Sequence, residues 1–372
     1  MSQALKRIIR EQALSLGFED VGFTDVAPFH LYVEEIQRRP AMYHWVQTDS
    51  FSTLRGSRPA SKHPWARSIV VLIRNYHRKS FPEHLLHVYG RCYMVDERKI
   101  RGEEYLRFKS LLDFLKGLGI HCLYDEELPA RMAAARAGIT QYGNNCFAFA
   151  RNSMGRCSWL EIIPLLVDVE LQPDEPSMVL GCPQNCKMEC LKACPTGALY
   201  EPLRMEPQKC IAFLTYYGPQ LTPIEFREPM GTWIYGCDLC QEACPINKAW
   251  AKRPLALNQD LMERGQGWDL RLILDMNLDY YQEKLWPQFF YISRSRPDRW
   301  QMNAARALGN VRDTRDIPLL ARKLKESPFE NVRAMCAWAL GRMGSASARR
   351  ALERALGDPS ETVRKEVQMA LG

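Results

Sequence analysis

The first 175 residues combine two hydrophobic patterns, one with the period of a helix and one made of continuous apolar runs. Residues 3–16 repeat apolar positions at helical spacing, which predicts an amphipathic helix. Residues 20–26, 68–77 and 157–171 are rich in apolar and β-branched residues, which predicts strands, the longer two of them buried. Residues 27–66 show no clear period and predict loops with short helices.

Further along this region, a predicted strand ends at a residue of chemical interest. Residues 103–118 predict a helix, and a short strand at 121–124 then delivers Asp125 at its carboxyl end. Another helix is predicted over 131–137. Helices and strands interleaved in this order predict a packed α+β domain over residues 1–175.

The last third of the chain carries an internal repeat. The triplet Ala-Leu-Gly ends at Gly309, Gly341 and Gly372, with spacings of 32 and 31 residues. This period, with paired helical patterns, predicts a linker and a short HEAT-like α-solenoid within residues 256–372. Basic residues gather here and could follow a phosphate backbone, although a solvated helix face would have the same composition. They are Arg294, Arg296, Arg299, Arg306, Arg312, Arg322, Lys323 and Lys325.

Between these regions, residues 176–255 hold eight of the thirteen cysteines. Four form a first block with three-residue gaps, three form a second block, one lies between the blocks, and a Cys-Pro step ends each block. Thiolates are soft anionic ligands that suit iron, and this outline is typical of a ferredoxin-like domain with two 4Fe-4S clusters. In that pattern the last cysteine of each block binds the other cluster. We therefore predict one cluster on Cys182, Cys186, Cys190 and Cys244, and the other on Cys194, Cys210, Cys237 and Cys240.

The wide gaps of the first block leave alternatives open. Cysteines at this spacing could also line one face of a helix, which would mean an altered loop or a cluster with one substituted ligand. Disulfides would require an oxidising compartment, and structural zinc more often uses Cys-x2-Cys pairs without two Cys-Pro steps.

Composition narrows the class of protein. With 372 residues, 46% of them hydrophobic, the chain can bury the cores of two or three domains, which argues against bulk disorder. Its formal charge of +7 is compatible with a nucleic-acid partner but does not indicate one alone. We find no apolar run of about 20 residues and no signal-peptide pattern, so we expect a cytoplasmic protein without membrane contact and with reduced thiols. The remaining cysteines are expected as small buried residues: Cys92, Cys122, Cys146, Cys157 and Cys336.

Two further features carry weak signals by themselves. Gly138 and Gly143 lie five residues apart, and such glycines let a backbone approach a ligand, but a helix C-cap followed by a turn explains them equally well. Asp125 is a candidate general acid, but a carboxylate at a strand end often caps the next helix or is simply solvated.

The chain resembles the epoxyqueuosine reductase family over essentially its whole length. The residues that carry the resemblance are GFTD from Gly22, the strand-borne Asp125, the AG-x4-G-x-N loop around Gly138, and the segments KCIAFLT from Lys209 and YGCDLCQEACPIN from Tyr235, followed by the terminal repeat. The last two segments and the repeat are the most specific, because ordinary ferredoxins lack them.

The resemblance implies a nitroreductase-like, cobalamin-binding first domain and an enzyme that removes the epoxide oxygen from epoxyqueuosine in the tRNA anticodon stem-loop. It implies that Asp125 donates a proton, for which we expect a carboxyl pKa near neutrality. It also places Arg131, Gly138, Gly143, Asn144 and Asn145 around cobalamin and substrate. We further expect a monomer with an external electron donor such as flavodoxin or ferredoxin.

The chain departs from the family on the substrate side. Where the family commonly carries an Asp-Tyr-His triplet, the nearest equivalent stretch is Lys99-Ile100-Arg101. The spacing from Asp125 to Gly138 is one residue short, and the first cysteine block is expanded. Two alternatives therefore stand beside the tRNA enzyme: a paralogous cobalamin and 4Fe-4S reductase of a small molecule, with reductive dehalogenase-like chemistry, and an electron-transfer protein without a substrate of its own.

Overall fold

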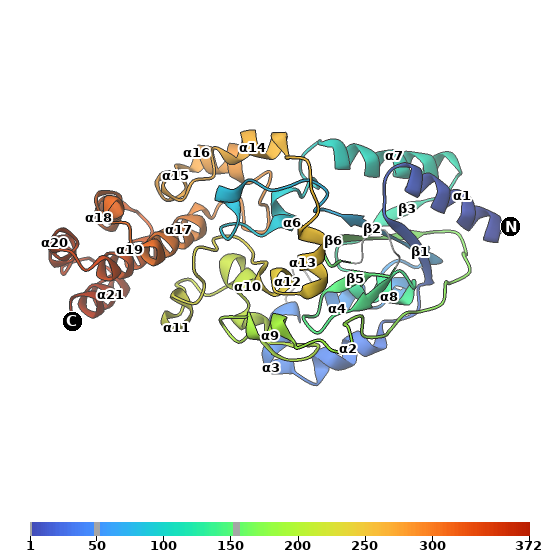
Figure 1. Cartoon of the computed structure of the whole chain (residues 1–372), viewed down its shortest axis with the longest axis horizontal. Coiled ribbons are helices and arrows are strands. Elements are labelled where there is room, and N and C mark those ends of the chain that lie inside the picture. The colour runs from blue at the N-terminus through green and yellow to red at the C-terminus, as the bar shows by residue number, and fades with distance from the viewer. Residues whose placement is uncertain (1, 48–52, 152–156) are drawn as a thin grey trace.

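The computed structural model describes residues 2–47, 53–151 and 157–372 (Figure 1). Its largest sheet has four strands in the order β1 (Asp20–Asp25), β2 (Ser68–Asn75), β6 (Leu160–Val167) and β3 (Cys122–Tyr124). Every neighbouring pair runs antiparallel, and β2 is buried along its whole length. An antiparallel sheet covered by helices confirms the α+β prediction.

Helices cover both faces of this sheet. One face packs against α1 (Ser2–Ser15) and α7 (Glu103–Gly117), and the other against α8 (Ala130–Arg136). The close approach of β1 to the end of α8 requires a glycine, because a Cβ on Gly22 would lie 2.3 Å from the carbonyl oxygen of Ala137. These elements agree with the helices and strands predicted from the hydrophobic pattern.

Short helices fill the region that lacked a hydrophobic period, as predicted. They are α2 (His30–Gln37), α3 (Pro40–Tyr43), η1 (His44–Gln47), α4 (Thr53–Gly56) and α5 (Pro59–Lys62). The strand predicted over 157–171 is shorter in the structure, because β6 covers just the part that pairs with β2 and β3.

The cysteine-rich region is built from short elements and turns. They are α9 (Glu189–Lys192), β7 (Leu199–Glu201), β8 (Arg204–Met205), η3 (Pro207–Lys209), α10 (Ile211–Tyr216), α11 (Ile224–Arg227), α12 (Leu239–Glu242) and α13 (Pro245–Ala251). A hairpin of the first region, β4 (Thr140–Tyr142) and β5 (Ala148–Ala150), lies against it. Within the first cysteine block, α9 contains Cys190 but not the other three cysteines. The alternative in which one helix presents all four is therefore wrong.

The carboxyl-terminal part is helical throughout. It contains α14 (Gln259–Gly265), α15 (Leu270–Asp275), α16 (Leu278–Tyr280), η4 (Tyr281–Leu285), α17 (Pro297–Val311), η5 (Thr314–Asp316), α18 (Ile317–Glu326), α19 (Glu330–Met343), α20 (Ala346–Arg354) and α21 (Glu361–Leu371). The repeated Ala-Leu-Gly triplet has a direct packing role. A Cβ on Gly309 would lie 2.9 Å from Ala339, and one on Gly341 would lie 2.7 Å from Ala370, so each glycine lets α17, α19 and α21 pack closely in series.

Packing crosses the predicted domain boundaries. η2 (Glu83–Leu85) and α6 (Arg91–Met94) lie in the first 175 residues, but their core residues join the carboxyl-terminal core. Tyr89, for example, is fully buried and stacks on Phe289 with a centroid distance of 5.2 Å. The boundaries at residues 175 and 255 stay predictions.

The helix α17 ties the solenoid to the cysteine-rich region through polar contacts. The Asn303 amide donates to the carbonyl oxygens of Thr215 and Ile234 at 2.8 and 3.0 Å. A second link is the buried pair between Arg227 of α11 and Glu366 of α21, with two contacts of 2.7 Å. The solenoid is therefore packed onto the cysteine-rich region and does not hang from a linker.

Candidate iron-sulfur and substrate site

Three cysteines of the first block and the last cysteine of the second block line one cavity. They are Cys182, Cys186, Cys190 and Cys244, which we call the first cage. The cavity is closed on one side by Asn144 and Asn145, and the Asn144 backbone N–H donates to the Cys182 Sγ at 3.3 Å. These are the four cysteines that the crossover pattern assigns to one cluster.

The other four cysteines are also neighbours. This second cage consists of Cys194, Cys210, Cys237 and Cys240. Burial raises the pKa of the Cys237 and Cys240 thiols well above the usual value, and the adjacent Cys210 raises both further. Cys194 acts in the same direction on Cys210 and Cys240. Two sets of four cysteines suit two extended clusters, because each 4Fe-4S cluster takes four thiolates.

The tip of the β4–β5 hairpin lies between the two cages. While Asn144 donates to the first cage, the Asn145 side-chain amide donates to the carbonyl oxygen of Cys240 in the second cage at 3.2 Å. Gly143 keeps the tip tight, since a Cβ there would lie 2.3 Å from a phenylalanine ring. Hydrogen bonds to cluster sulfurs raise the reduction potential, so this hairpin can both position the cages and tune the first one.

The two ends of α8 have different surroundings. At its start, the Arg131 guanidinium lies 5.1 Å from the centre of the Phe147 ring. Burial raises the pKa of the Cys210 thiol, and the nearby Arg131 lowers it in part, which places Arg131 beside the second cage. At its other end, Gly138 adopts a φ of +74°, and a Cβ there would lie 2.3 Å from the Glu175 carbonyl oxygen. The geometry of Gly138 is therefore explained by the helix end and its packing.

Asp125 follows β3 as predicted, but its carboxylate is held in an ion-pair network. Lys62 Nζ donates to its two oxygens at 2.9 and 2.8 Å, His63 Nε2 lies 3.0 Å from Oδ2, and the Glu127 N–H donates at 3.0 Å. Burial raises the pKa of Asp125, but the hydrogen bonds from Lys62, Glu127 and His63 outweigh it, so the pKa lies below its usual value. The expectation of a near-neutral pKa is wrong for this arrangement.

A polar cavity lies where the sheet meets the helical part, and we call it the interdomain cavity. It has a volume of about 200 Å³, and its lining includes Tyr93, Asp96, Arg98, Tyr124, Glu161 and Tyr291. A second cavity of about 160 Å³ shares Arg98, Tyr124 and Glu161 and adds Glu126. Ligand sites commonly occupy such junctions between domains.

Arg98 lines both of these cavities, and the sequence analysis did not single it out as a site residue. It donates to Asp96 at 2.7 Å and to the Tyr291 hydroxyl at 2.7 Å, and it lies 3.4 Å from Glu126 Oε1. Asp96 and Arg98 directly precede the stretch Lys99-Ile100-Arg101 that the sequence singled out. The signal that could have found them is the charged run Asp-Glu-Arg ahead of the helix α7.

The second cage reaches the interdomain cavity through α10. Cys210 is the N-cap residue of α10, and Tyr216 is the last residue of that helix. The Tyr216 hydroxyl lies 3.0 Å from that of Tyr93, and its ring centre lies 5.4 Å from that of Tyr291. Both of these tyrosines line the cavity. One six-residue helix therefore joins a predicted cluster ligand to the cavity wall.

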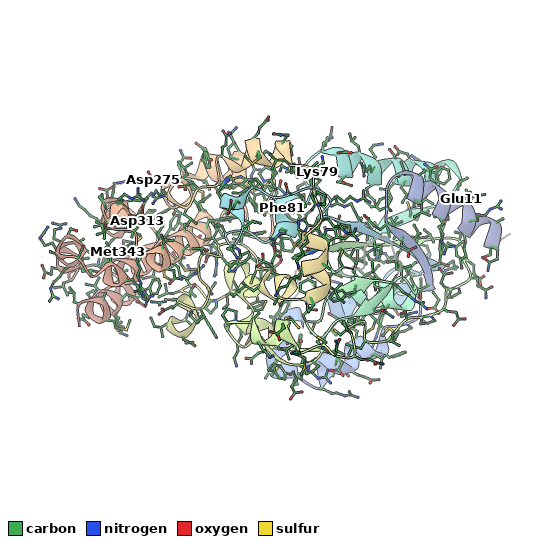
Figure 2. The ribbon with its side chains drawn as sticks, in the orientation of Figure 1. Glu11, Lys79, Phe81, Asp275, Asp313 and Met343 are labelled. Carbon is green, nitrogen blue, oxygen red and sulfur yellow. The ribbon has the colours of Figure 1, made fainter. Side chains whose placement is uncertain are left out.

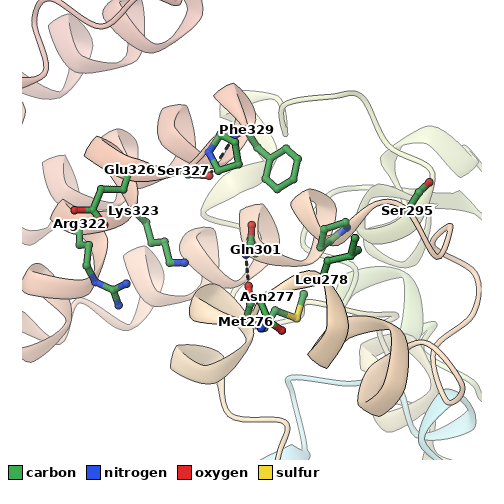
Figure 3. Close-up of a pocket in the computed structure, with 12 residues that line it drawn as sticks. Met276, Asn277, Leu278, Ser295, Gln301, Arg322, Lys323, Glu326, Ser327 and Phe329 are labelled. Atoms are coloured by element: carbon green, nitrogen blue, oxygen red, sulfur yellow. Dashed lines mark hydrogen bonds between the residues drawn. The ribbon is translucent and has the colours of Figure 1, made fainter.

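Another cavity, of about 440 Å³, lies in the solenoid near α17 and α18 (Figure 3). Gln301 donates to the Met276 carbonyl oxygen at 2.8 Å across its floor. Its two cations, Arg322 and Lys323, pair with Asp275 at 2.8 and 2.9 Å. Because Asp275 offsets this positive charge, the cavity is a poor match for phosphate.

Most of the basic residues that could have followed a phosphate backbone are engaged within the protein. Arg299 donates to the carbonyl oxygens of Gly218 and Pro219 at 2.8 Å, and the fully buried Arg306 donates to that of Gly231 at 2.7 Å. Arg296 pairs with Asp298 at 2.8 Å. Asp275, the partner of Arg322, lies in the same part of the molecule as Asp313, which pairs with another arginine, Arg315 (Figure 2). These contacts favour a structural role for this set of cations.

The remaining cysteines only partly follow the prediction. Cys157 and Cys336 are buried, whereas Cys92, Cys122 and Cys146 are partly exposed. Among the helices that the structure describes, we find none that is both long and apolar enough to span a bilayer.

Comparison with known proteins agrees with this arrangement. Residues 182–247 match the model of a 4Fe-4S double cluster binding domain, and residues 290–372 match HEAT repeats. The epoxyqueuosine reductase of Bacillus subtilis (strain 168) is 28% identical, and the match covers 99% of this chain and 95% of that protein. By sequence and by fold, the chain is a relative of the epoxyqueuosine reductases.

Solved structures of epoxyqueuosine reductases show the same fold. One with an epoxyqueuosine-modified tRNA-Tyr stem loop has a TM-score of 0.81 and 27% identity, covering 100% of this chain and 99% of that chain. Another, from Bacillus subtilis, has a TM-score of 0.80 and 26% identity at the same coverage, and its catalytic aspartate loop is swung out of the active site. The HEAT-like solenoid and the 4Fe-4S double cluster domain predicted from the sequence are thereby confirmed.

Proposed function

We propose that this protein is an oxidoreductase that reduces epoxyqueuosine to queuosine in tRNA, with two 4Fe-4S clusters and cobalamin as cofactors. The observation that carries the proposal is the short path along α10 from Cys210 of the second cage to Tyr216 at the interdomain cavity. A ligand for an electron carrier is thus joined by one short helix to tyrosines that line a polar cavity, in which a substrate could be reduced. The likeness to an epoxyqueuosine reductase that binds a modified tRNA stem loop supports this choice of substrate.

The residues present fit these cofactors. The two cages would hold the clusters, and Arg131, Gly143, Asn144 and Asn145 would lie around cobalamin and substrate, with Gly138 contributing by ending α8. The hydroxyl, guanidinium and carboxylate groups of the interdomain cavity, which has a volume of about 200 Å³, would bind a polar group of the substrate. When bound, the clusters pass electrons singly and cobalamin carries out the reduction of the epoxide.

Asp125 would supply a proton to the departing oxygen. Converting an epoxide to an alkene consumes two electrons and two protons and releases one water, so an acid near the oxygen avoids a free alkoxide. In the observed position Asp125 is ionised by Lys62 and His63, and it would have to leave them to take up a proton. The relative whose catalytic aspartate loop is swung out of its active site supports such a movement.

The partner would be the tRNA anticodon stem-loop, and the protein would act in the cytoplasm as a monomer with flavodoxin or ferredoxin as its electron donor. A second candidate function is reduction of a small molecule by the same cofactors. It is favoured by the engagement of Arg299 and Arg306 within the fold and by the charged Asp96 and Arg98 at the cavity.

The test is anaerobic reconstitution with iron, sulfide and cobalamin, followed by incubation with tRNA that bears epoxyqueuosine. Mass spectrometry of the nucleosides should show the loss of one oxygen atom, and gel-shift should show salt-sensitive tRNA binding. Eight irons and a bound corrin without tRNA binding or deoxygenation would overturn the tRNA assignment and leave the small-molecule reductase.

A further inference from the structure

The first cage lies under an exposed part of the surface. Residues 183–188 are exposed apart from the half-buried Cys186. Just before them, Met178, Val179 and Leu180 are large apolar residues with exposed side chains, and Val179 retains 55% of its accessible surface. Two backbone hydrogen bonds hold this segment against Tyr142 of β4. The Tyr142 N–H donates to the Val179 carbonyl oxygen at 3.2 Å, and the Gly181 N–H donates to the Tyr142 carbonyl oxygen at 2.7 Å. Apolar side chains are thus held outward beside the first cage.

Met188 adds to this surface in an unfavourable backbone conformation. It precedes α9 with φ 54° and ψ 41°, in the left-handed region that costs a non-glycine residue about 1 kcal/mol. Its side chain is nonetheless exposed, at 39%. It lies between Cys186 and Cys190, inside the expanded part of the cysteine block. Such strain often marks functional sites, so an outward-facing thioether beside the cage calls for an explanation.

Lysines also lie in the exposed loop and on the short helices that follow cysteines of the first cage. Lys187 lies in the exposed loop, Lys192 ends α9, and Lys248 and Lys252 lie on and just after α13. The helix α13 begins directly after Cys244 of the first cage, and α12, which precedes it, packs against α9. Of the nearby acids, Glu189 pairs with Lys192 at 3.1 Å. The surface beside the first cage thus combines exposed apolar side chains with lysines on the neighbouring loop and helices, and we call these lysines the rim.

We propose that this surface docks a small acidic one-electron carrier protein. The proposal rests on the function above and identifies where its electrons enter. Each encounter would oxidise the carrier by one electron and reduce one cluster by one electron. Complexes between redox proteins are small, weak and steered by charge, which fits a surface that combines a few exposed apolar side chains with lysines.

A nucleic acid fits this surface less well. Phosphate groups would pair with the lysines, but interfaces with nucleic acids are more polar than interfaces between proteins. Met178, Val179, Leu180 and Met188 would then lose water without gaining apolar contacts. The first cage is also the one that does not adjoin the interdomain cavity, so a carrier here would leave the substrate side free.

The experiment uses the reconstituted full-length protein, with reduced flavodoxin as the probe and no tRNA. The variant K187E/K192E/K248E reverses three rim charges, and V179S removes an apolar contact without changing charge. The matched control, K284E/K325E/K365E, applies the same charge change to exposed lysines in the helical part. Two quantities are measured at low and high salt: the Kd for flavodoxin and the second-order rate of cluster reduction by stopped-flow absorbance.

Charge reversal at the rim should raise the Kd and lower the reduction rate by about tenfold or more at low salt, with a smaller difference at high salt. V179S should raise the Kd about threefold at any salt. Reduction by dithionite should stay within about twofold in all variants.

Two outcomes of this experiment would overturn the proposal: flavodoxin binding that is unchanged in the rim variant, or an equal loss of binding in the control. In a separate gel-shift, a loss of tRNA binding without a loss of flavodoxin binding would also overturn it. Failure of the proposed function is distinguishable from failure of this proposal, because the docking experiment contains no epoxyqueuosine. It would appear as normal flavodoxin binding and cluster reduction here, together with no deoxygenation of tRNA in the separate turnover assay.

Discussion

The two cysteine cages offer the same four thiols but have different surroundings. The first cage lies beneath an exposed loop with apolar side chains and lysines, and a backbone N–H donates to its Cys182. The second cage sits at the start of α10, whose far end contacts the interdomain cavity. The two cages therefore differ in the residues around them and not in their four thiols. The surroundings suit the first cage to receive electrons and the second cage to deliver them.

The largest effect is expected from removing a ligand of the second cage. Cys240→Ser should reduce the iron content from about eight to about four per chain, since one cluster loses a thiolate. Deoxygenation of tRNA should fall by about 10³-fold or more with every reductant, because α10 links the second cage, and not the first, to the cavity wall. Iron analysis, visible spectra and turnover check this. Substantial turnover with a small reductant would show that the second cage does not deliver the electrons.

The next effect concerns Asp125, the proposed acid, which follows β3 and is paired with Lys62 and His63. Asp125→Asn should lower turnover by about 10²-fold or more, the usual contribution of general acid catalysis. Glu126→Gln, which alters a side chain already facing Arg98, is the matched control and should cost less than about fivefold. The reverse order would assign the proton to Glu126. Lys62→Gln should also change the pH profile of turnover, because it removes the charge that holds Asp125 ionised.

Removing a ligand of the first cage should have a milder effect when the electron donor is small. Cys186→Ser should again leave about four irons, but turnover with a small chemical reductant should drop only about tenfold, since the second cage can still be reduced directly. With flavodoxin as the donor, turnover should be lost. Equal losses with both donors would remove the distinction between a receiving and a delivering cage.

The sequence predicted much of this arrangement because the signals are local. The cysteine spacing and the Cys-Pro steps led to the two sets of four that the structure brings together, and the Ala-Leu-Gly repeat marked the glycines through which α17, α19 and α21 pack. Helices and strands with strong hydrophobic patterns were placed within a few residues of their observed ends.

Long-range partners could not be read from the sequence. Asp125 was expected to be a near-neutral acid, but its pKa is set by Lys62, which lies 63 positions earlier in the chain. Arg306 looked like a surface cation, yet it is buried and caps carbonyl groups of the cysteine-rich region. Such pairings depend on packing between distant segments, which spacing and composition do not encode.

A smaller effect is expected where the sheet meets the first cage. The buried His77 packs edge-on against Trp159, and its carbonyl oxygen accepts from Trp250 at the end of α13. Burial and the nearby Arg91 lower the pKa of His77 from 6.5 to about 4. Between these values the unfolded chain binds a proton that the folded chain does not, so the free energy of unfolding should fall on acidification, by up to about 3 kcal/mol at pH 4.

Urea unfolding between pH 4 and 7 measures this dependence, and His77→Phe serves as the control because it keeps an aromatic ring without the titrating group. A pH dependence that is the same in both proteins would mean that His77 does not link protonation to this junction.

The smallest effect is expected at Met188, whose left-handed backbone conformation lowers the stability of the fold beside the first cage. Met188→Gly should raise the free energy of unfolding by up to about 1 kcal/mol, because glycine adopts the left-handed conformation without the steric cost. The same change removes the exposed thioether and should weaken flavodoxin binding, while Cys240 and the second cage keep their spectra. Leu203→Gly, at another exposed residue with a φ of 60°, is the matched control. It should change the free energy of unfolding but should weaken flavodoxin binding less than Met188→Gly does. If Met188→Gly stabilises the protein and leaves flavodoxin binding intact, the strained methionine is not part of the docking surface.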